Sequence, residues 1–162
     1  MSWEKTLYQY GLLIEEKTRD YFTEVTGKAY NYHPFIAGVY ETLKEFVLRK
    51  GRRLASCSTL LMYNGYTKKV DDRILKVCVG IELYRHCILI HDDLVDRDDF
   101  RRGSKTVHKA LSEKRDERFG EGIAVFLGDI VYTLAVKAIL DSGFEESKLT
   151  RVLHILSEGY RE

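Results

Sequence analysis

Residues 88–103 read ILIHDDLVDRDDFRRG, and the organisation of the whole chain can be inferred outward from this stretch. An apolar run that we predict to be helical leads into three carboxylates, Asp92, Asp93 and Asp96, and a predicted loop with two arginines follows. Side chains four positions apart in a helix share a face, so we expect Asp92 and Asp96 to lie one turn apart. Two carboxylates in that arrangement repel each other unless a cation neutralises them.

The carboxylate pair predicts a site for a hard cation. Mg²⁺ takes oxygen ligands and keeps several of its waters, which phosphate oxygens can replace. Arg101 and Arg102 follow a few residues later, and a guanidinium is a planar, permanently charged group that matches phosphate geometry. Asp92 and Asp96 are therefore candidate metal ligands in a site that handles a diphosphate.

Other interpretations of the same stretch agree less well with its residues and spacing. An acidic cluster at a helix end is often only solvated surface. The spacing does not fit a calcium-binding EF-hand, because the glycine and the closing glutamate of that loop are missing. A metal phosphohydrolase with a His-Asp pair needs further histidine ligands, and His33, His86 and His108 do not supply them at a recognisable spacing.

The ordered set of motifs resembles the trans-isoprenyl diphosphate synthase family, the polyprenyl synthetases. That family has a DDxxD motif followed by an RRG loop, and here DDLVD stands at residues 92–96 and RRG at residues 101–103. The sequences KTVH at 105–108 and LGD at 127–129 also agree with the family. The likeness runs from about residue 51 to residue 129 and continues more loosely toward both ends.

The resemblance implies a Mg²⁺-dependent prenyltransferase that condenses isopentenyl diphosphate with an allylic diphosphate. Asp92 and Asp96 correspond to the Mg²⁺ ligands, and Asp93 supports them. Arg101 corresponds to the residue that holds the allylic diphosphate, and Arg102 to one that holds isopentenyl diphosphate. The family is usually dimeric, so the resemblance also implies a homodimer.

This sequence departs from the family pattern in two ways. The family segment GGKRLRP falls on KGRRLAS at residues 50–56, so that its lysine becomes Arg52 and its second arginine becomes Ala55. The family also has His or Gln seven residues before the first aspartate, where this chain has Arg85. We expect Arg85 to restore the charge lost at Ala55, with an ion pair to Glu82 as the alternative, because an unpaired arginine in an apolar helix is costly.

Product length in the family depends on bulky aromatic residues four and five positions before the first aspartate. Here these positions are Ile88 and Cys87, and the aromatic Tyr84 lies a further turn away. The resemblance therefore implies a product longer than C15, of geranylgeranyl type. The alternatives are a non-catalytic or regulatory helical subunit with the same fold, and a terpene cyclase, against which Arg52 and Arg102 argue.

Composition excludes several other classes of protein. The 162 residues carry a formal net charge of +1, so no basic footprint for nucleic acid or an anionic membrane is evident. The N-terminus lacks a signal-peptide pattern, and no uncharged run reaches membrane-spanning length. Cys57, Cys78 and Cys87 lie in apolar runs without zinc-site spacing, which predicts reduced, buried thiols in a cytoplasmic protein.

Hydrophobic periodicity predicts helices throughout, with no convincing strand, and hence an all-α antiparallel bundle. The expected helices cover residues 2–26 with a stop at Gly27, 34–48, 54–63, 71–96, 107–111, 123–140 and 145–162, with residues 115–118 as a charged connector. The family members are about twice as long, with a second aspartate-rich motif in the half beyond this chain. We therefore interpret residues 1–162 as the N-terminal part of one synthase domain, incomplete and inactive alone, the alternative being a complete small helical protein.

Overall fold

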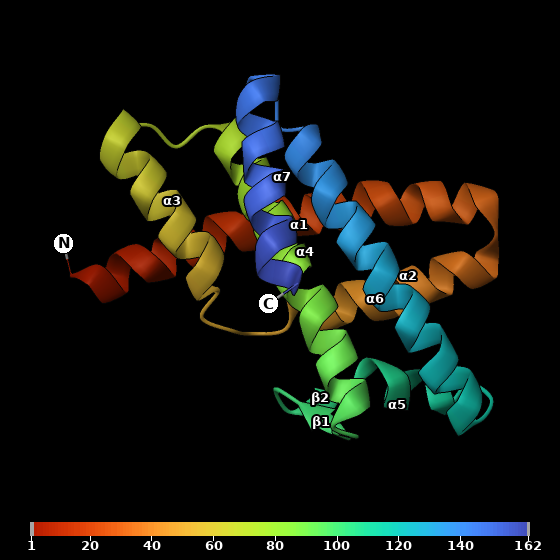
Figure 1. Cartoon of the computed structure of the whole chain (residues 1–162). Helices are drawn as coiled ribbons and strands as arrows, with labels where there is room; N and C mark the ends of the chain where they lie inside the picture. Colours follow the sequence, from red (N-terminus) through yellow and green to blue (C-terminus); the bar gives the residue numbers. More distant parts are fainter. Residues whose placement is uncertain (1, 162) are drawn as a thin grey trace.

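The computed structural model describes residues 2–161, and it shows an all-α bundle with one short β-hairpin (Figure 1). The elements are α1 (Trp3–Tyr32), α2 (Pro34–Leu48), α3 (Leu54–Thr67), α4 (Asp72–Val95), β1 (Phe100–Arg101), β2 (Ser104–Lys105), α5 (Val107–Ser112), α6 (Glu117–Leu140) and α7 (Glu146–Arg161). The predicted all-α class is confirmed.

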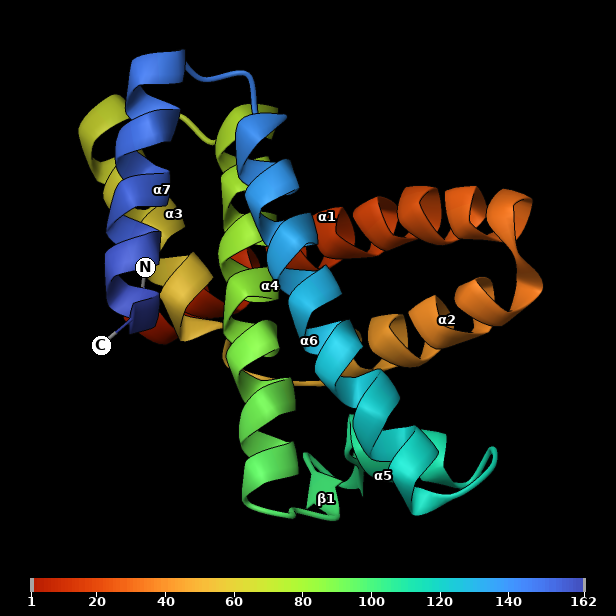
Figure 2. The ribbon, with the colours of Figure 1, turned by 45° about the vertical axis from the view of Figure 1, so that its right-hand side comes forward.

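Helix α4 is the centre of the bundle, and α6 runs antiparallel beside it (Figure 2). The two helices approach closely because Gly80 has no side chain: a Cβ there would lie 2.5 Å from Cγ1 of Ile139 and 2.9 Å from the carbonyl oxygen of Ala135. Leu83 and Ile90 of α4 are buried in the same core, which α1, α2, α5 and α6 complete. The central helix therefore delivers its carboxyl end, with the aspartates, to one end of the bundle.

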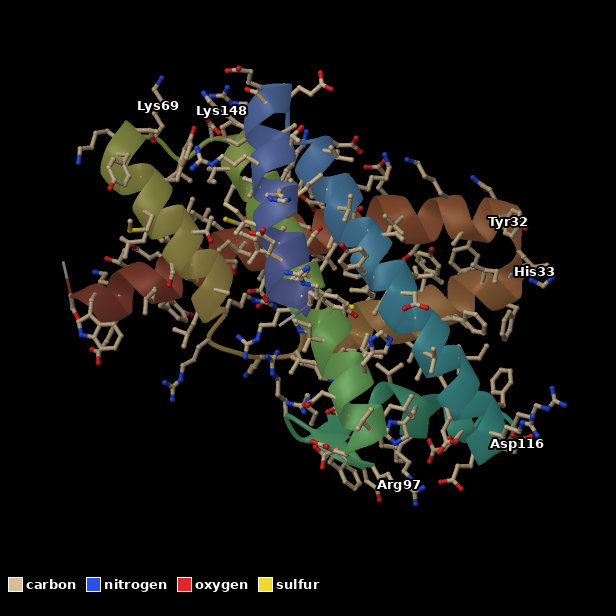
Figure 3. The ribbon with its side chains drawn as sticks, in the orientation of Figure 1. Tyr32, His33, Lys69, Arg97, Asp116 and Lys148 are labelled. Carbon is tan, nitrogen blue, oxygen red and sulfur yellow. The ribbon has the colours of Figure 1, made fainter. Side chains whose placement is uncertain are left out.

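Helix α1 runs six residues further than expected and ends at Tyr32. Gly27 does not stop it, because a glycine inside a helix costs only about 1 kcal/mol and packing overrides that preference. The end comes instead at His33, where the residue before a proline is driven out of helical geometry. Pro34 begins α2 as predicted, and the His33 ring accepts a hydrogen bond from the Phe35 amide at 3.1 Å. Figure 3 shows Tyr32 and His33 at this turn.

Two other predicted boundaries were wrong. Helix α3 continues past the expected Asn64-Gly65 stop to Thr67, where Lys68 takes the left-handed conformation that ends it. Helix α6 begins at Glu117, inside the expected connector, because Asp116 caps it by accepting a hydrogen bond from the Phe119 amide at 2.8 Å. Boundaries depend on such local caps, which hydrophobic periodicity does not report.

The predicted start of α4 near residue 71 and the predicted burial of the three cysteines are confirmed. Asp71 caps α4, and its carboxylate accepts a hydrogen bond from the Ile74 amide at 3.2 Å. Cys57, Cys78 and Cys87 are buried free thiols. Burial raises the pKa of each thiol, to about 12 for Cys78, which keeps these groups protonated and unreactive.

The β-hairpin is a correction, since no strand was predicted. Phe100 pairs with Lys105 and Arg101 with Ser104, and the connecting residues Arg102 and Gly103 have φ values of +53° and +80°. Positive φ at both central positions is the signature of the tight turns that close two-residue hairpins. Strands this short carry no hydrophobic alternation, so periodicity could not reveal them.

By length and composition alone, one helix among the described residues, α6, could cross a membrane. The core helix of a soluble protein passes the same test. Ala124, Leu127 and Val131 of α6 are buried in the core that this helix shares with α4 and α5.

Candidate diphosphate site at the carboxyl end of α4

The aspartates lie where α4 ends. The Asp96 amide donates to the carbonyl oxygen of Asp92 at 2.8 Å, so the two residues are one helical turn apart, as predicted. Both side chains are exposed at the surface. Figure 3 places Arg97 at this tip of the molecule, at the opposite end from Lys69 and Lys148.

Arg101 turns back from the hairpin onto the aspartates. Its Nη2 donates to Oδ2 of Asp92 at 3.0 Å and lies 3.8 Å from Asp98, and its Nε donates to Oδ1 of Asp93. The Asp93 carboxylate is buried, and its Oδ2 has no hydrogen-bond partner among the described residues. Burial raises the pKa of Asp93 above its usual range, and the ion pair with Arg101 opposes that shift. Asp93 therefore anchors Arg101 beneath the more exposed Asp92.

Arg102 is exposed overall, but its guanidinium lies against the loop after α2 and is partly desolvated there. Its Nη1 donates to the carbonyl oxygen of Arg49 at 3.4 Å. Burial lowers the pKa of the Arg102 guanidinium, and repulsion from Arg85, Arg53 and Arg101 lowers it further. Arg101 and Arg53 are paired with carboxylates, but Arg85 and Arg102 have no carboxylate partner within residues 2–161, and like charges that repel each other favour an anion at this place.

The alternative role expected for Arg85, an ion pair with Glu82, is not what the structure contains. Glu82 is buried, and its carboxylate accepts from Nη1 of Arg53 at 3.2 Å and from the Ser56 hydroxyl at 2.6 Å. Arg85 has no ion pair among residues 2–161 and contributes to the positive field at Arg102 instead.

Arg52 lies in the loop between α2 and α3. It is exposed and has no ion pair or side-chain hydrogen bond within the described part of the chain. Its segment lines an open groove of about 810 Å³ against Trp3 and Tyr8 at the start of α1. The buried cation of this loop is its neighbour Arg53, with a side chain that is 2% exposed.

Asp92 and Asp96 supply part of the ligand set that a hard cation such as Mg²⁺ needs. Among residues 2–161, no three His, Cys, Asp or Glu side chains form a ready metal cage. Asp92 and Asp96 nevertheless present carboxylate oxygens on one face, and no ion pair within the described part of the chain competes for Asp96. Two such carboxylates suit Mg²⁺, which fills its remaining positions with water and phosphate oxygens.

The predicted apolar space below Asp92 contains aromatic residues from other helices. The Tyr160 hydroxyl lies 3.7 Å from Sγ of Cys87, and the rings of Tyr84, Tyr132 and Tyr160 pack with centroids 5.4–6.3 Å apart. Tyr84 and Tyr132 also line a cavity of about 260 Å³ between α4, α6 and α7. The side chain of Ile88 is 43% exposed, so this face of α4 is only partly covered.

His91 and the LGD motif lie side by side on α4 and α6. The His91 Nε2 lies 3.2 Å from the carbonyl oxygen of Val125, which only accepts, so this nitrogen carries the proton. It also lies 3.8 Å from Oδ1 of Asp129. Gly128 makes room for the ring, because a Cβ there would overlap it.

Sequence reasoning missed two groups that support the site. Glu82 had a usable signal, since an acid in an otherwise apolar helix requires a buried partner, which is Arg53. Arg49 had none: its side chain reaches the hairpin backbone, and no pattern in the sequence predicts that contact.

The fold and the site together define a helical bundle with carboxylates and guanidinium groups at one end of its central helix. Residues 37–162 match the polyprenyl synthetase family. The chain belongs to that family.

Named relatives agree with this assignment. A short chain isoprenyl diphosphate synthase of Methanocaldococcus jannaschii is 34% identical over 122 residues, which are 74% of this chain and 34% of that protein. A farnesyl diphosphate synthase of Bacillus subtilis is 36% identical over 110 residues, 67% of this chain and 34% of that protein. The chain thus spans about a third of the length of these curated relatives.

A solved structure supports the fold. It is the geranylgeranyl pyrophosphate synthase of Corynebacterium glutamicum in complex with isoprenyl diphosphate and magnesium, and it superposes with a TM-score of 0.79. The match covers 93% of this chain and 45% of that chain at 22% identity.

Proposed function

We propose that this chain carries the first aspartate-rich half of a Mg²⁺-dependent prenyltransferase, which condenses isopentenyl diphosphate with an allylic diphosphate. The single observation that carries the proposal is the convergence of Asp92 and Asp93 with Arg101 at the carboxyl end of α4, beside Arg102. Exposed carboxylates next to guanidinium groups with unused donors suit a metal-bound diphosphate.

Each residue has a distinct role in this proposal. Asp92 and Asp96 would hold Mg²⁺, which when bound neutralises charge on a diphosphate leaving group. Asp93 orients Arg101, which binds the allylic diphosphate. Arg102 binds isopentenyl diphosphate.

Arg52 and Arg85 supply further positive charge to the isopentenyl diphosphate. Support for Arg85 comes from its repulsion of Arg102, because two like charges held close together are relieved by an anion between them. Arg52 can reach a ligand only from an exposed position.

The proposed product is of geranylgeranyl type or similar. The proposal rests on Cys87 and Ile88, which stand where bulky aromatic residues shorten the product in the family, and the tyrosine cluster at Tyr84, Tyr132 and Tyr160 would limit the depth open to a prenyl chain. We also propose a homodimer in the cytoplasm. Family membership supports the dimer, and the buried free thiols agree with a reducing compartment.

Binding of Mg²⁺ and inorganic pyrophosphate, measured by isothermal titration calorimetry, tests the proposal without requiring turnover, which the chain alone is not expected to perform. We expect Asp96→Asn to weaken the Mg²⁺-dependent binding by about tenfold or more, since it removes a charged ligand. Asp20→Asn, another exposed carboxylate on α1, is the matched control and should bind as the wild type does. Equal affinity in all three proteins would contradict the proposed site.

A non-catalytic or regulatory helical subunit is the second candidate. Ala55 favours it, since an exposed alanine stands where the family has a phosphate-binding arginine. Pyrophosphate binding that is absent, or that ignores Mg²⁺, would support this candidate over the enzyme.

A further inference from the structure

We propose that Arg49 is a positioning residue for diphosphate binding: it fastens the β1–β2 hairpin to the end of α2 and so fixes where Arg101 and Arg102 point. The inference rests on the function proposed above. Arg49 follows the last residue of α2, and its side chain is only 8% exposed although it carries a permanent charge.

The guanidinium of Arg49 contacts the backbone of the hairpin. Its Nη1 donates to the carbonyl oxygens of Arg101 at 3.2 Å and Ser104 at 3.5 Å, and its Nη2 donates to that of Lys105 at 2.7 Å. These carbonyls belong to both strands, so one side chain holds the two strands together and ties them to α2.

Two neighbours on α2 hold the guanidinium itself. Nε and Nη2 of Arg49 donate to the two carboxylate oxygens of Glu45, at 3.0 and 2.6 Å. The guanidinium carbon lies 5.0 Å from the centre of the Phe46 ring, within cation–π range. Glu45 and Phe46 of α2 thus fix the orientation in which the Arg49 guanidinium contacts the hairpin.

The donor inventory separates Arg49 from the ligand-binding arginines. An arginine has five N–H donors, and those of Arg49 have five acceptors: two on Glu45 and three on the hairpin. None is left for a phosphate. Nη1 of Arg101 makes no hydrogen bond among residues 2–161, and Arg102 donates only one. Arg49 therefore positions the hairpin, and Arg101 and Arg102 bind the diphosphates.

The hairpin also contacts the loop after α2 through the side chain of Arg102. Arg102 donates to the carbonyl oxygen of Arg49, and its guanidinium lies against Gly51, where a Cβ would come within 2.8 Å of Cζ. Arg102 also has a positive φ, a conformation that persists in a bulky residue only when its surroundings impose it. The hairpin and the loop after α2 thus hold each other in place.

Two measurements on Arg49→Ala and Arg49→Lys test this role. Hydrogen–deuterium exchange of the amides at residues 100–105 should speed up in Arg49→Ala, because three contacts to the hairpin are lost. Calorimetry with Mg²⁺ and inorganic pyrophosphate should show affinity about 10-fold to 100-fold weaker, as when groups that orient metal ligands are removed. Arg49→Lys should recover only part of the hairpin protection and part of the pyrophosphate affinity, since an ammonium group lacks the planar fork of a guanidinium.

Arg73→Ala is the matched control. Arg73 also lies 5.0 Å from an aromatic ring, that of Phe144, and pairs with Asp71 at 3.0 Å, but it has no contact with the hairpin. It should leave hairpin exchange and pyrophosphate affinity unchanged.

The outcomes distinguish the two proposals. Wild-type affinity or unaltered hairpin exchange in Arg49→Ala would overturn the role of Arg49 and leave the proposed function standing. An equal loss in Arg73→Ala would also overturn it, because a general loss of stability would then explain the data. A wild-type chain that binds no pyrophosphate would refute the proposed function, and the positioning role with it.

Discussion

Arg102 combines a strained backbone conformation with a place at the proposed diphosphate site. Its φ of +53° is unfavourable for a side chain with a Cβ, and repulsion from Arg85 and Arg53 helps to lower the pKa of its guanidinium. A residue selected for stability alone would be Asn or Gly, which tolerate the first position of such a turn. The presence of arginine there is consistent with a demand for charge at the site.

Arg102→Asn should change the free energy of unfolding little, because relief of the left-handed strain, worth about 0.5–1 kcal/mol, is offset by loss of the Arg102 contacts with Arg49 and Gly51. The same variant should bind Mg²⁺ and pyrophosphate more weakly. Urea unfolding and calorimetry measure the two effects, and a variant that is both less stable and fully able to bind would contradict this explanation.

Sequence reasoning at the residue scale succeeded for charged residues within a motif. Asp92 and Asp96 lie one turn apart because helical spacing requires it, and Arg101 reaches Asp92 across a short loop. Sequence reasoning missed Arg49. The direction of a long side chain depends on which backbone oxygens lie nearby, and only the folded chain supplies these.

At the scale of elements, the pairing of α4 with α6 depends on one small residue. Gly80 lies under the carbonyl oxygen of Ala135 and the side chain of Ile139, and the backbone oxygen cannot move unless the helices separate. The same kind of close approach occurs where Gly128 of α6 receives the His91 ring of α4. These glycines set the distance between the two central helices.

Gly80→Ala should therefore lower the free energy of unfolding by about 1–3 kcal/mol, the usual cost of overpacking. This loss is expected although alanine favours a helix by about 1 kcal/mol over glycine. Gly65→Ala in α3 is the control: nothing lies within 4 Å of a Cβ there, so the change should be neutral or stabilising. Chemical denaturation measures both, and equal effects of the two substitutions would show that helix propensity dominates packing here.

For the molecule as a whole, buried charge and buried histidine link stability to pH. Burial lowers the pKa of His86 to about 4, although contact with Glu82 opposes the shift, and Arg53 and Arg102 add to it. Burial also lowers the pKa of His108. The folded state thus favours neutral histidine. The free energy of unfolding should be highest above about pH 6.5, where histidine is neutral in the unfolded chain too, and should decline as the pH falls toward 4.

Between pH 7 and pH 5 we expect a loss of about 1–2 kcal/mol from His86. His86→Gln should flatten this dependence, with His108 leaving a smaller slope of the same sign. His154→Gln, on the exposed side of α7, should retain the wild-type slope. Urea titrations at pH 5, 6 and 7 provide the comparison, and three parallel curves would contradict the assignment to His86.

The sequence alone determined the all-α class, the order of the helices, the cap at Asp71 and the position of the DDLVD aspartates. These follow from periodicity and local hydrogen bonds, which act over a few residues. Only the tertiary structure decided that Glu82 pairs with Arg53 and not with Arg85. The same holds for the contact of Tyr160 with Cys87 and for the hydrogen bonds from Arg49 to the hairpin. Each of these contacts joins segments far apart in the chain, so its energy depends on how the helices pack and on no local pattern.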